Sequence, residues 1–302
     1  MLLEPIIASH FRSDGGNMFG PVPRGIWSRH IAPDEDNTIA QVAHAMLVTM
    51  PDGSRGLVET GCGNREKYSA KQLRFARVGE GWPLIEALAE RGIAPADIEF
   101  VILTHLHWDH IGGAIQPDGS LTFPNATHYV DLEEMVLAES GSPLLGSAYP
   151  PEDIAALANS GKLRRLLHRS VPKSAPPITE VRPGIRLLRT GGHTEFHGVV
   201  LFEGTEEHPI EIAYPHAPAG TIRRVLFAAD MVPTRFHLRL LFHTGYDTYP
   251  MDTRRWKQHW LPLMTRDDTL LMFGHDATAF GARLQAGVRG SEVRELWEVG
   301  AR

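Results

Sequence analysis

The chain has 302 residues, of which 42% are hydrophobic and 22% charged, so it is long enough to bury a large core. Its formal net charge of −6 argues against a general nucleic-acid binder, because such proteins normally present a basic surface to the phosphates. The single cysteine, Cys62, excludes an internal disulfide and a cysteine-built zinc site, and the lack of a signal peptide or a ~20-residue apolar run leads us to expect a soluble cytoplasmic protein with no membrane partner.

The first half of the chain predicts a hairpin, a helix and a buried strand. Apolar alternation over residues 40–50 and 55–59 indicates two strands, and the segment Pro51-Asp52-Gly53-Ser54 between them has the composition of a tight turn. The apolar residues of segment 84–89 follow helical spacing, and Gly92 ends that helix. Residues 100–103 then form a short apolar strand.

This strand leads into the most informative segment of the chain, Thr104-His105-Leu106-His107-Trp108-Asp109-His110 followed by Ile111-Gly112-Gly113. An extended conformation would place His105, His107 and Asp109 on one side, with His110 following as the chain turns. Burying so many polar rings without a partner is costly, so we interpret the segment as a metal site. The alternative is a polar loop that happens to be rich in histidine.

The second half of the chain repeats one arrangement, in which an apolar strand ends close to a residue that can bind a metal. Strands expected at 185–189, 225–229 and 270–273 are followed by His193, Asp230 and His275, respectively. Functional sites in mixed α/β proteins favour the loops beyond strand ends. We therefore expect these side chains to belong to the same site as the histidine-rich segment.

Two stretches look like additions to this scaffold. The N-terminal extension, residues 1–37, is rich in glycine, proline and aromatic residues between positions 14 and 27, and an insertion at about 132–177 contains a helical piece at 152–158. Each stretch either forms a wall of a substrate pocket or simply decorates the surface.

The motifs resemble those of the metallo-β-lactamase fold superfamily, and they occur in the order found in that family. The matching blocks are His105-Leu106-His107-Trp108-Asp109-His110, Gly191-Gly192-His193-Thr194, Ala229-Asp230 and Gly274-His275. The resemblance implies a single α/β domain over residues 1–302. It also implies a four-layer αββα sandwich, with two β-sheets face to face, helices outside and two metal ions at one sheet edge.

The resemblance also implies a ligand set. His105, His107 and His193 would bind the first ion, Asp109, His110 and His275 the second, and Asp230 would bridge both. Imidazole and carboxylate suit zinc, our first expectation, as well as manganese, iron or cobalt. Glu59 stands where the family usually has aspartate, in a position that orients the ligands, and His197 is a second residue that we expect behind the ligands.

Such a centre predicts a hydrolase. A hydroxide shared by the two ions would be the nucleophile, and Asp109 would carry a proton to the leaving group. The segment 16–23 with Trp27, the pair Tyr246-Asp247 and the pair His275-Asp276 resemble the quorum-quenching N-acyl homoserine lactonases, with the methyl-parathion hydrolases nearby. The implied substrates are small molecules, namely lactones such as N-acyl homoserine lactones, or related esters.

One departure concerns substrate contact. Related lactonases carry a tyrosine three residues after the bridging aspartate, and this chain has Pro233 there. His237, His243 or Tyr246 could supply the missing hydrogen bond. Apolar walls for an acyl or aryl group could come from aromatic side chains that are, alternatively, simple core residues, namely Phe19, Trp27, Trp108 and Phe236.

Other functions remain open on the sequence alone. Phosphotriester or other phosphoester hydrolysis is the main alternative, and β-lactam, thioester or persulfide substrates are further ones. A non-catalytic metal-binding sensor on the same scaffold would be expected to have lost ligands, whereas all seven positions are filled here. The resemblance also implies a homodimer.

Overall fold

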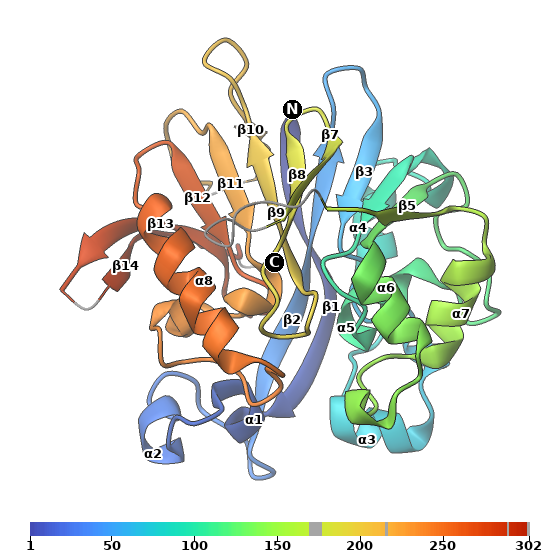
Figure 1. Ribbon diagram of the computed structural model, residues 1–302, viewed down its shortest axis with the longest axis horizontal. Coiled ribbons are helices and arrows are strands. Elements are labelled where there is room, and N and C mark those ends of the chain that lie inside the picture. Colours follow the sequence, from blue (N-terminus) through green and yellow to red (C-terminus); the bar gives the residue numbers. More distant parts are fainter. Residues whose placement is uncertain (169–176, 215–216, 289, 301–302) are drawn as a thin grey trace. The chain divides into compact units, whose positions relative to one another are not determined.

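The computed structural model describes residues 1–168, 177–214, 217–288 and 290–300 (Figure 1). The chain divides into two compact units: unit 1 comprises Met1–Phe11 and Ala43–Ser170, and unit 2 comprises Arg12–Val42 and Val171–Arg302. Strands β1 (Leu2–Asp14) and β2 (Thr38–Thr49) pass from one unit into the other. Two large sheets accompanied by helices confirm the mixed α/β fold implied by the sequence.

The sheet of unit 1 has the strand order β1-β2-β3-β4-β5-β6. Its remaining strands are β3 (Arg55–Val58), β4 (Phe100–Ile102), β5 (Thr127–Asp131) and β6 (Leu163–Leu166). Strands β2 and β3 form the expected antiparallel hairpin, and β3 to β6 run parallel to one another. Because parallel neighbours need a crossover, helical segments lie between them in the chain.

The helices of unit 1 cover one face of this sheet (Figure 1). They are α3 (Ala70–Ala76), α4 (Pro83–Glu90), α5 (Trp108–Ile111), α6 (Leu132–Glu139) and α7 (Pro151–Asn159), with 3-10 turns η1 (Arg65–Lys67), η2 (Pro95–Asp97), η3 (Gly112–Ala114) and η4 (Pro143–Leu145). Leu84 and Leu88 of α4 and Met135 of α6 are fully buried with Leu57 and Val101 of the sheet. Removing these apolar side chains from water is the main force that holds the helices to the sheet.

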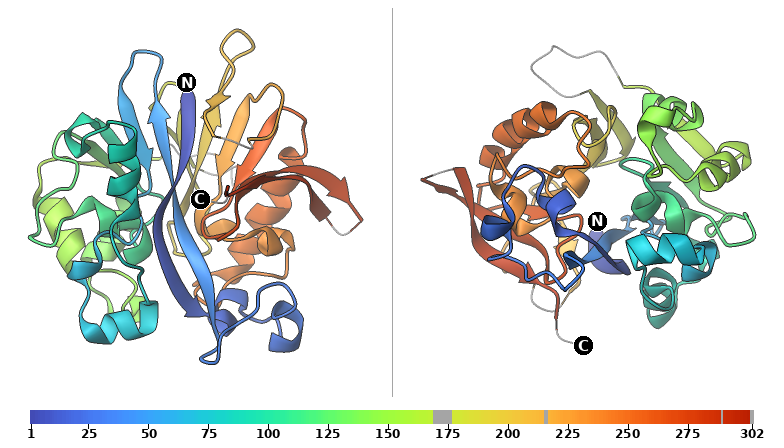
Figure 2. Two further views of the ribbon diagram at one scale, coloured as in Figure 1. Left: turned by 180° about the vertical axis from the view of Figure 1, so that it is seen from behind. Right: turned by 90° about the horizontal axis from the view of Figure 1, so that it is seen from below.

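The sheet of unit 2 has the order β14-β13-β12-β11-β9-β8-β7. Its strands are β7 (Ile178–Arg182), β8 (Ile185–Arg189), β9 (Gly198–Glu203), β11 (Arg224–Phe227), β12 (Thr269–Met272), β13 (Ala279–Gly287) and β14 (Gly290–Glu298); the short β10 is Glu211–Ile212. Only β11 and β12 pair in parallel among its described ladders, and the helix α8 (Pro250–Leu263) connects them. Leu261 and Met264 pack on Leu226 and Leu271. The β13–β14 hairpin forms one edge of this sheet (Figure 2).

The N-terminal segment is part of unit 2 after Phe11. Two short helices, α1 (Gly15–Phe19) and α2 (Arg24–Trp27), follow β1, and unit 2 also contains the 3-10 turns η5 (Ala229–Met231) and η6 (Arg235–Leu238). The rings of Phe19 and Trp27 stack at 5.5 Å in an apolar cluster that includes Phe242. The start of the expected extension, residues 2–14, is a sheet strand rather than an appendage.

The structure corrects one local expectation. Helix α5 begins at Trp108, so Asp109 and His110 lie on a helical turn and not on the extended segment that we predicted through Asp109. His107, with φ −72° and ψ 156°, is the last extended residue. After His107 the backbone becomes helical, so the directions of the Asp109 and His110 side chains follow the period of a helix and not the alternation of a strand.

Among the described residues, no helix combines the length and the apolar character needed to cross a bilayer.

A buried histidine in strand β5 predicts how stability depends on pH. Burial is the largest influence on His128 and lowers its pKa from 6.5 to about 4, and the backbone around Ala126 and Lys162 only partly offsets this. The unfolded chain therefore binds a proton in a range where the folded chain does not, and stability falls as pH drops from 6.5 to 4. The unaltered protein should lose about 3 kcal/mol of its free energy of unfolding over this pH range because of His128, and the variant His128→Leu should not show this loss. The free energies of unfolding of the variant and the unaltered protein, both freed of metal with a chelator, are measured in urea at pH 7 and pH 4.5. An equal decrease between the two pH values in both proteins would contradict the prediction.

Candidate metal centre

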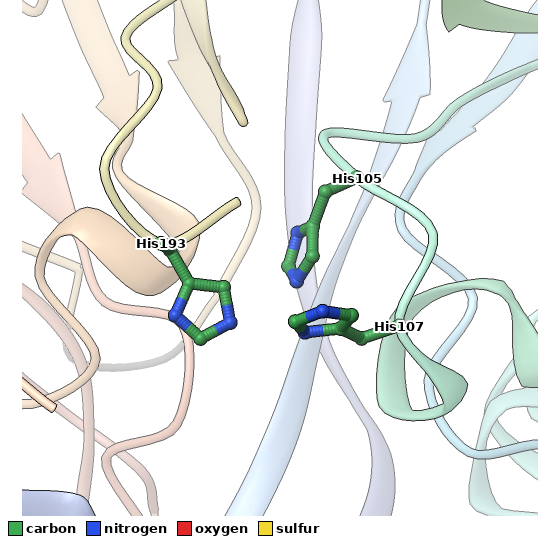
Figure 3. A group of neighbouring side chains, drawn as sticks. All are labelled: His105, His107 and His193. Atoms are coloured by element: carbon green, nitrogen blue, oxygen red, sulfur yellow. The ribbon is translucent and has the colours of Figure 1, made fainter. Parts of the chain in front are cut away.

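In unit 1, the histidine-rich segment gathers its side chains at the end of β4. His105 and His107 extend from the loop between β4 and α5 (Figure 3), with ring centroids 4.6 Å apart. The centroid of the His110 ring lies 3.9 Å from that of His105. Asp109 and His110 each offer a ligand atom within 4.8 Å of the other. We call these four residues, His105, His107, Asp109 and His110, the unit 1 half-site.

Close backbone packing explains the two glycines that follow the half-site. A Cβ at Gly113 would lie 2.1 Å from the carbonyl oxygen of Thr60, and one at Gly112 would lie 2.4 Å from that of Cys62. Without side chains there, the loop after β3 comes close enough for Thr60 to donate two hydrogen bonds, from its amide and its hydroxyl, to the carbonyl of His110. The glycines thus allow the end of α5 to pack closely against the loop that follows β3.

Glu59 connects the half-site to β3. It adopts the left-handed conformation (φ 67°), which is strained for a residue with a side chain. One carboxylate oxygen accepts a hydrogen bond from the amide of Thr104 at 2.8 Å, and the other lies 3.1 Å from Nδ1 of His110. The glutamate therefore reaches the ring of His110, one of the expected ligands.

The insertion contributes a second buried carboxylate. Glu134 of α6 accepts hydrogen bonds from the amide of Leu106 at 3.2 Å and from the hydroxyl of Tyr149 at 2.9 Å. The Tyr149 ring packs edge-on against His107, with centroids 4.8 Å apart. The described part of segment 132–177 therefore supports the histidine loop from behind, while residues 169–176 lie outside the described chain. Nothing in the sequence spacing pointed to Glu134 or Tyr149.

In unit 2, Asp230 lies between two histidines. Its two carboxylate oxygens are 3.0 Å from Nε2 of His193 and 2.7 Å from Nε2 of His275, and all three residues are buried. We call these three residues the unit 2 half-site; His193 is the third side chain drawn in Figure 3. Ala229, just before Asp230, has a positive φ of 43°. Backbone strain therefore occurs next to the proposed ligand Asp230, as it does at Glu59, which contacts the proposed ligand His110.

The field in the unit 2 half-site favours positive charge. Burial lowers the pKa of His193, but the carboxylates of Asp230 and Asp247 more than offset burial and raise that pKa to about 10. A bound divalent cation would satisfy the same carboxylates. The imidazoles and carboxylates of both half-sites therefore fit first-row divalent metal ions by their chemistry.

Residues behind the unit 2 half-site hold its loops. Nδ1 of His275 lies 2.9 Å from the carbonyl of Val42, so this nitrogen donates and Nε2 faces Asp230. Pro233 is buried, and its carbonyl accepts a hydrogen bond from the amide of His275 at 2.7 Å. His197, which we expected behind the ligands, is buried with its ring 5.9 Å from that of His193 and its Nδ1 2.9 Å from the Thr190 hydroxyl.

The candidate substrate residues differ in accessibility. Phe19, Trp27 and His237 are at most 1% exposed, whereas Trp108 and Phe236 are half-buried and Tyr246 is 44% exposed. Both nitrogens of His237 are engaged, with the carbonyl of Met18 and the hydroxyl of Thr234. His243 is similarly engaged by the carbonyl of Thr244 and the guanidinium of Arg254.

The chain belongs to the metallo-beta-lactamase superfamily, because the model of that family matches residues 40–275. The match includes all seven expected ligands. Among solved structures, a probable metal-dependent hydrolase from Staphylococcus aureus is similar, with a TM-score of 0.82 and 26% identity over 99% of this chain and 97% of the other. The dizinc quorum-quenching lactonase AidC has a TM-score of 0.68 and 16% identity over 99% of this chain and 93% of its own, a likeness of fold.

Curated relatives match shorter stretches. An N-acyl homoserine lactonase from Bacillus sp is 28% identical over 127 residues, which is 42% of each chain. The N-acyl homoserine lactonase AttM of Azorhizobium caulinodans is 39% identical over 62 residues, 20% of this chain and 21% of AttM. The chain thus spans less than half the length of these relatives.

The role of Asp230 can be tested by counting metal. Asp230→Ala leaves His193 and His275 without the carboxylate between them, so we expect the zinc-loaded variant to retain fewer ions after dialysis. Elemental analysis measures the count, with Asp118→Ala, on the exposed turn after η3, as a control that should bind like the unaltered protein. Full metal content in Asp230→Ala would contradict the ligand assignment.

Proposed function

We propose that this protein is a dinuclear metal-dependent hydrolase that opens lactones, such as N-acyl homoserine lactones, or cleaves related esters. In this proposal, as the family resemblance implies, His105, His107 and His193 would hold one ion, Asp109, His110 and His275 would hold the other, and Asp230 would serve both. The observation that carries the proposal is that every one of these side chains follows the end of a strand, on a loop or on the first helical turn after it, within the region matched to the superfamily.

Two divalent ions, zinc first among them, would supply Lewis-acid polarisation of the scissile carbonyl and a water of lowered pKa. The chain's own contribution is to orient ligands and to move a proton. Asp109 is the residue suited to the proton transfer, because its side chain is 14% exposed while that of His110 is 3% exposed. The Asp109 carboxylate can take the proton of the attacking hydroxide as the new C–O bond forms, and then give that proton to the leaving oxygen as the scissile C–O bond breaks.

The lactone is favoured by the relatives, since the names of AidC and of the curated Bacillus and Azorhizobium proteins state lactonase activity. The departure at Pro233 means that no side-chain hydroxyl exists there to contact the substrate. With both nitrogens of His237 and of His243 engaged, Tyr246 is the polar candidate with an accessible side chain.

The first experiment measures hydrolysis directly. Purified protein is loaded with zinc, manganese or cobalt, and acid release from an N-acyl homoserine lactone is followed, with a chelated sample as control. We expect metal-dependent ring opening. An aryl ester and a phosphotriester are measured in parallel, and preference for the phosphotriester would transfer the proposal to phosphoester hydrolysis. Protein that retains fewer than two ions and hydrolyses none of the three would instead support a metal-binding sensor.

The proton transfer assigned to Asp109 predicts a dependence on the leaving group. In Asp109→Asn, kcat for the lactone, whose leaving alkoxide needs a proton, should fall by about 10²–10⁴-fold. The loss for a p-nitrophenyl ester should be roughly tenfold or less, because its leaving group departs without protonation. Metal content is measured on the same sample, so that loss of an ion is recognised. Equal losses for both substrates at full metal content would contradict the role of Asp109.

A further inference from the structure

Asp247 is a buried carboxylate that our sequence analysis quoted without giving it a role. Its side chain is fully buried, and one oxygen, Oδ1, lies 3.1 Å from Nδ1 of His193. Thr244 donates a hydrogen bond of 2.6 Å to the same oxygen, and Thr253 donates one of 2.8 Å to the other oxygen. Every residue of this network belongs to unit 2.

The backbone brings Asp247 to His193 by close packing. The amides of Thr248 and Tyr249 donate hydrogen bonds to the carbonyls of His193 and Gly192, at 3.0 and 2.8 Å. Gly192 has φ 98°, and a Cβ there would lie 2.4 Å from the hydroxyl oxygen of Thr253. Only glycine allows the His193 loop to approach the start of α8 this closely. The backbone packing therefore fixes Asp247 next to His193.

The charge of Asp247 is held in place by its partners. The hydroxyls of Thr244 and Thr253 and Nδ1 of His193 surround this buried carboxylate within hydrogen-bond distance. Both hydroxyls donate to the carboxylate, so it can only accept from Nδ1 of His193. That nitrogen must therefore carry a proton, so Nε2, the atom 3.0 Å from Asp230, is the nitrogen that can exchange its own proton for a metal ion.

We propose that Asp247 is a positioning residue for the metal centre, which fixes the orientation and the Nδ1–H tautomer of His193. The proposal rests on the metal-binding part of the proposed function and is independent of which substrate is hydrolysed. Carboxylates or carbonyls behind a ligand histidine typically raise metal affinity by 10–100-fold. The Val42 carbonyl behind His275 is an example with a neutral acceptor in the same unit, whereas Asp247 adds a charge.

The expected effect is on zinc binding itself. Asp247→Asn preserves the shape of the side chain and removes its charge, so zinc affinity should fall by roughly tenfold; Asp247→Ala removes the acceptor as well and should cost up to roughly 100-fold. Competition with a chromophoric chelator measures both affinities. Thr253→Val, which removes one donor to Asp247, should weaken zinc binding in the same direction and by less.

A second readout separates positioning from general support of the fold. In protein labelled with ¹⁵N-histidine, the His193 ring signals of the unaltered zinc enzyme should show a protonated Nδ1 and a metal-bound Nε2, and Asp247→Asn should shift or broaden that pattern. The matched control is Asp252→Asn, since this carboxylate lies on the first turn of α8 and pairs with Arg255 at 2.6 Å on the surface. The control should match the unaltered protein in both measurements.

The outcomes are distinct. Weaker zinc binding in Asp247→Asn, together with altered His193 signals, supports the proposal even if no lactone is hydrolysed. Zinc affinity within twofold of the unaltered protein, with unchanged His193 signals, overturns it. Because Asp247→Asn keeps the volume and one acceptor oxygen, the test does not depend on whether Asp247→Ala folds.

Discussion

Buried pairs of carboxylate and imidazole are the constraint on which both half-sites depend. Asp230 with His193 and His275, and Glu59 with His110, place charge in regions from which water is excluded. Burying a carboxylate is costly unless donors or a cation surround it, so the surrounding loops must supply these partners. The positive φ angles at Glu59 and Ala229 show that the backbone is held in strained conformations to do so.

The scaffold of each unit is arranged to meet this demand. In unit 1, β4 delivers the histidine loop, β3 delivers Glu59, and α6 delivers Glu134 behind it. In unit 2, β11 ends at Phe227, shortly before Asp230, and β12 ends at Met272, shortly before His275. Helix α8 between them presents Thr253 to the network around His193. The apolar cores hold the strand ends in place, and the loops that follow those ends thereby hold their polar side chains in fixed positions.

The departures from the family pattern have structural explanations. Pro233 lacks the hydroxyl of the tyrosine found in related lactonases, yet its carbonyl receives the amide of His275 and so fixes the loop of a proposed ligand. Glu59, longer than the usual aspartate, spans from the amide of Thr104 to the ring of His110. Both positions thus contact a proposed ligand while differing in side chain from the family.

The sequence by itself predicted the candidate ligands, their order and the strands that precede them, because hydrophobic periodicity and the crowding of polar rings are local signals. Strand 185–189 and the hairpin around residues 51–54 match the structure closely for this reason. Only the tertiary structure decided that Asp109 lies on a helical turn, and that Glu134, Tyr149 and Asp247 contact the loops of candidate ligands distant in sequence. These contacts join segments from 15 to 54 residues apart, as between Glu134 and Tyr149 and between His193 and Asp247, and no local pattern encodes a partner whose position depends on how whole elements pack.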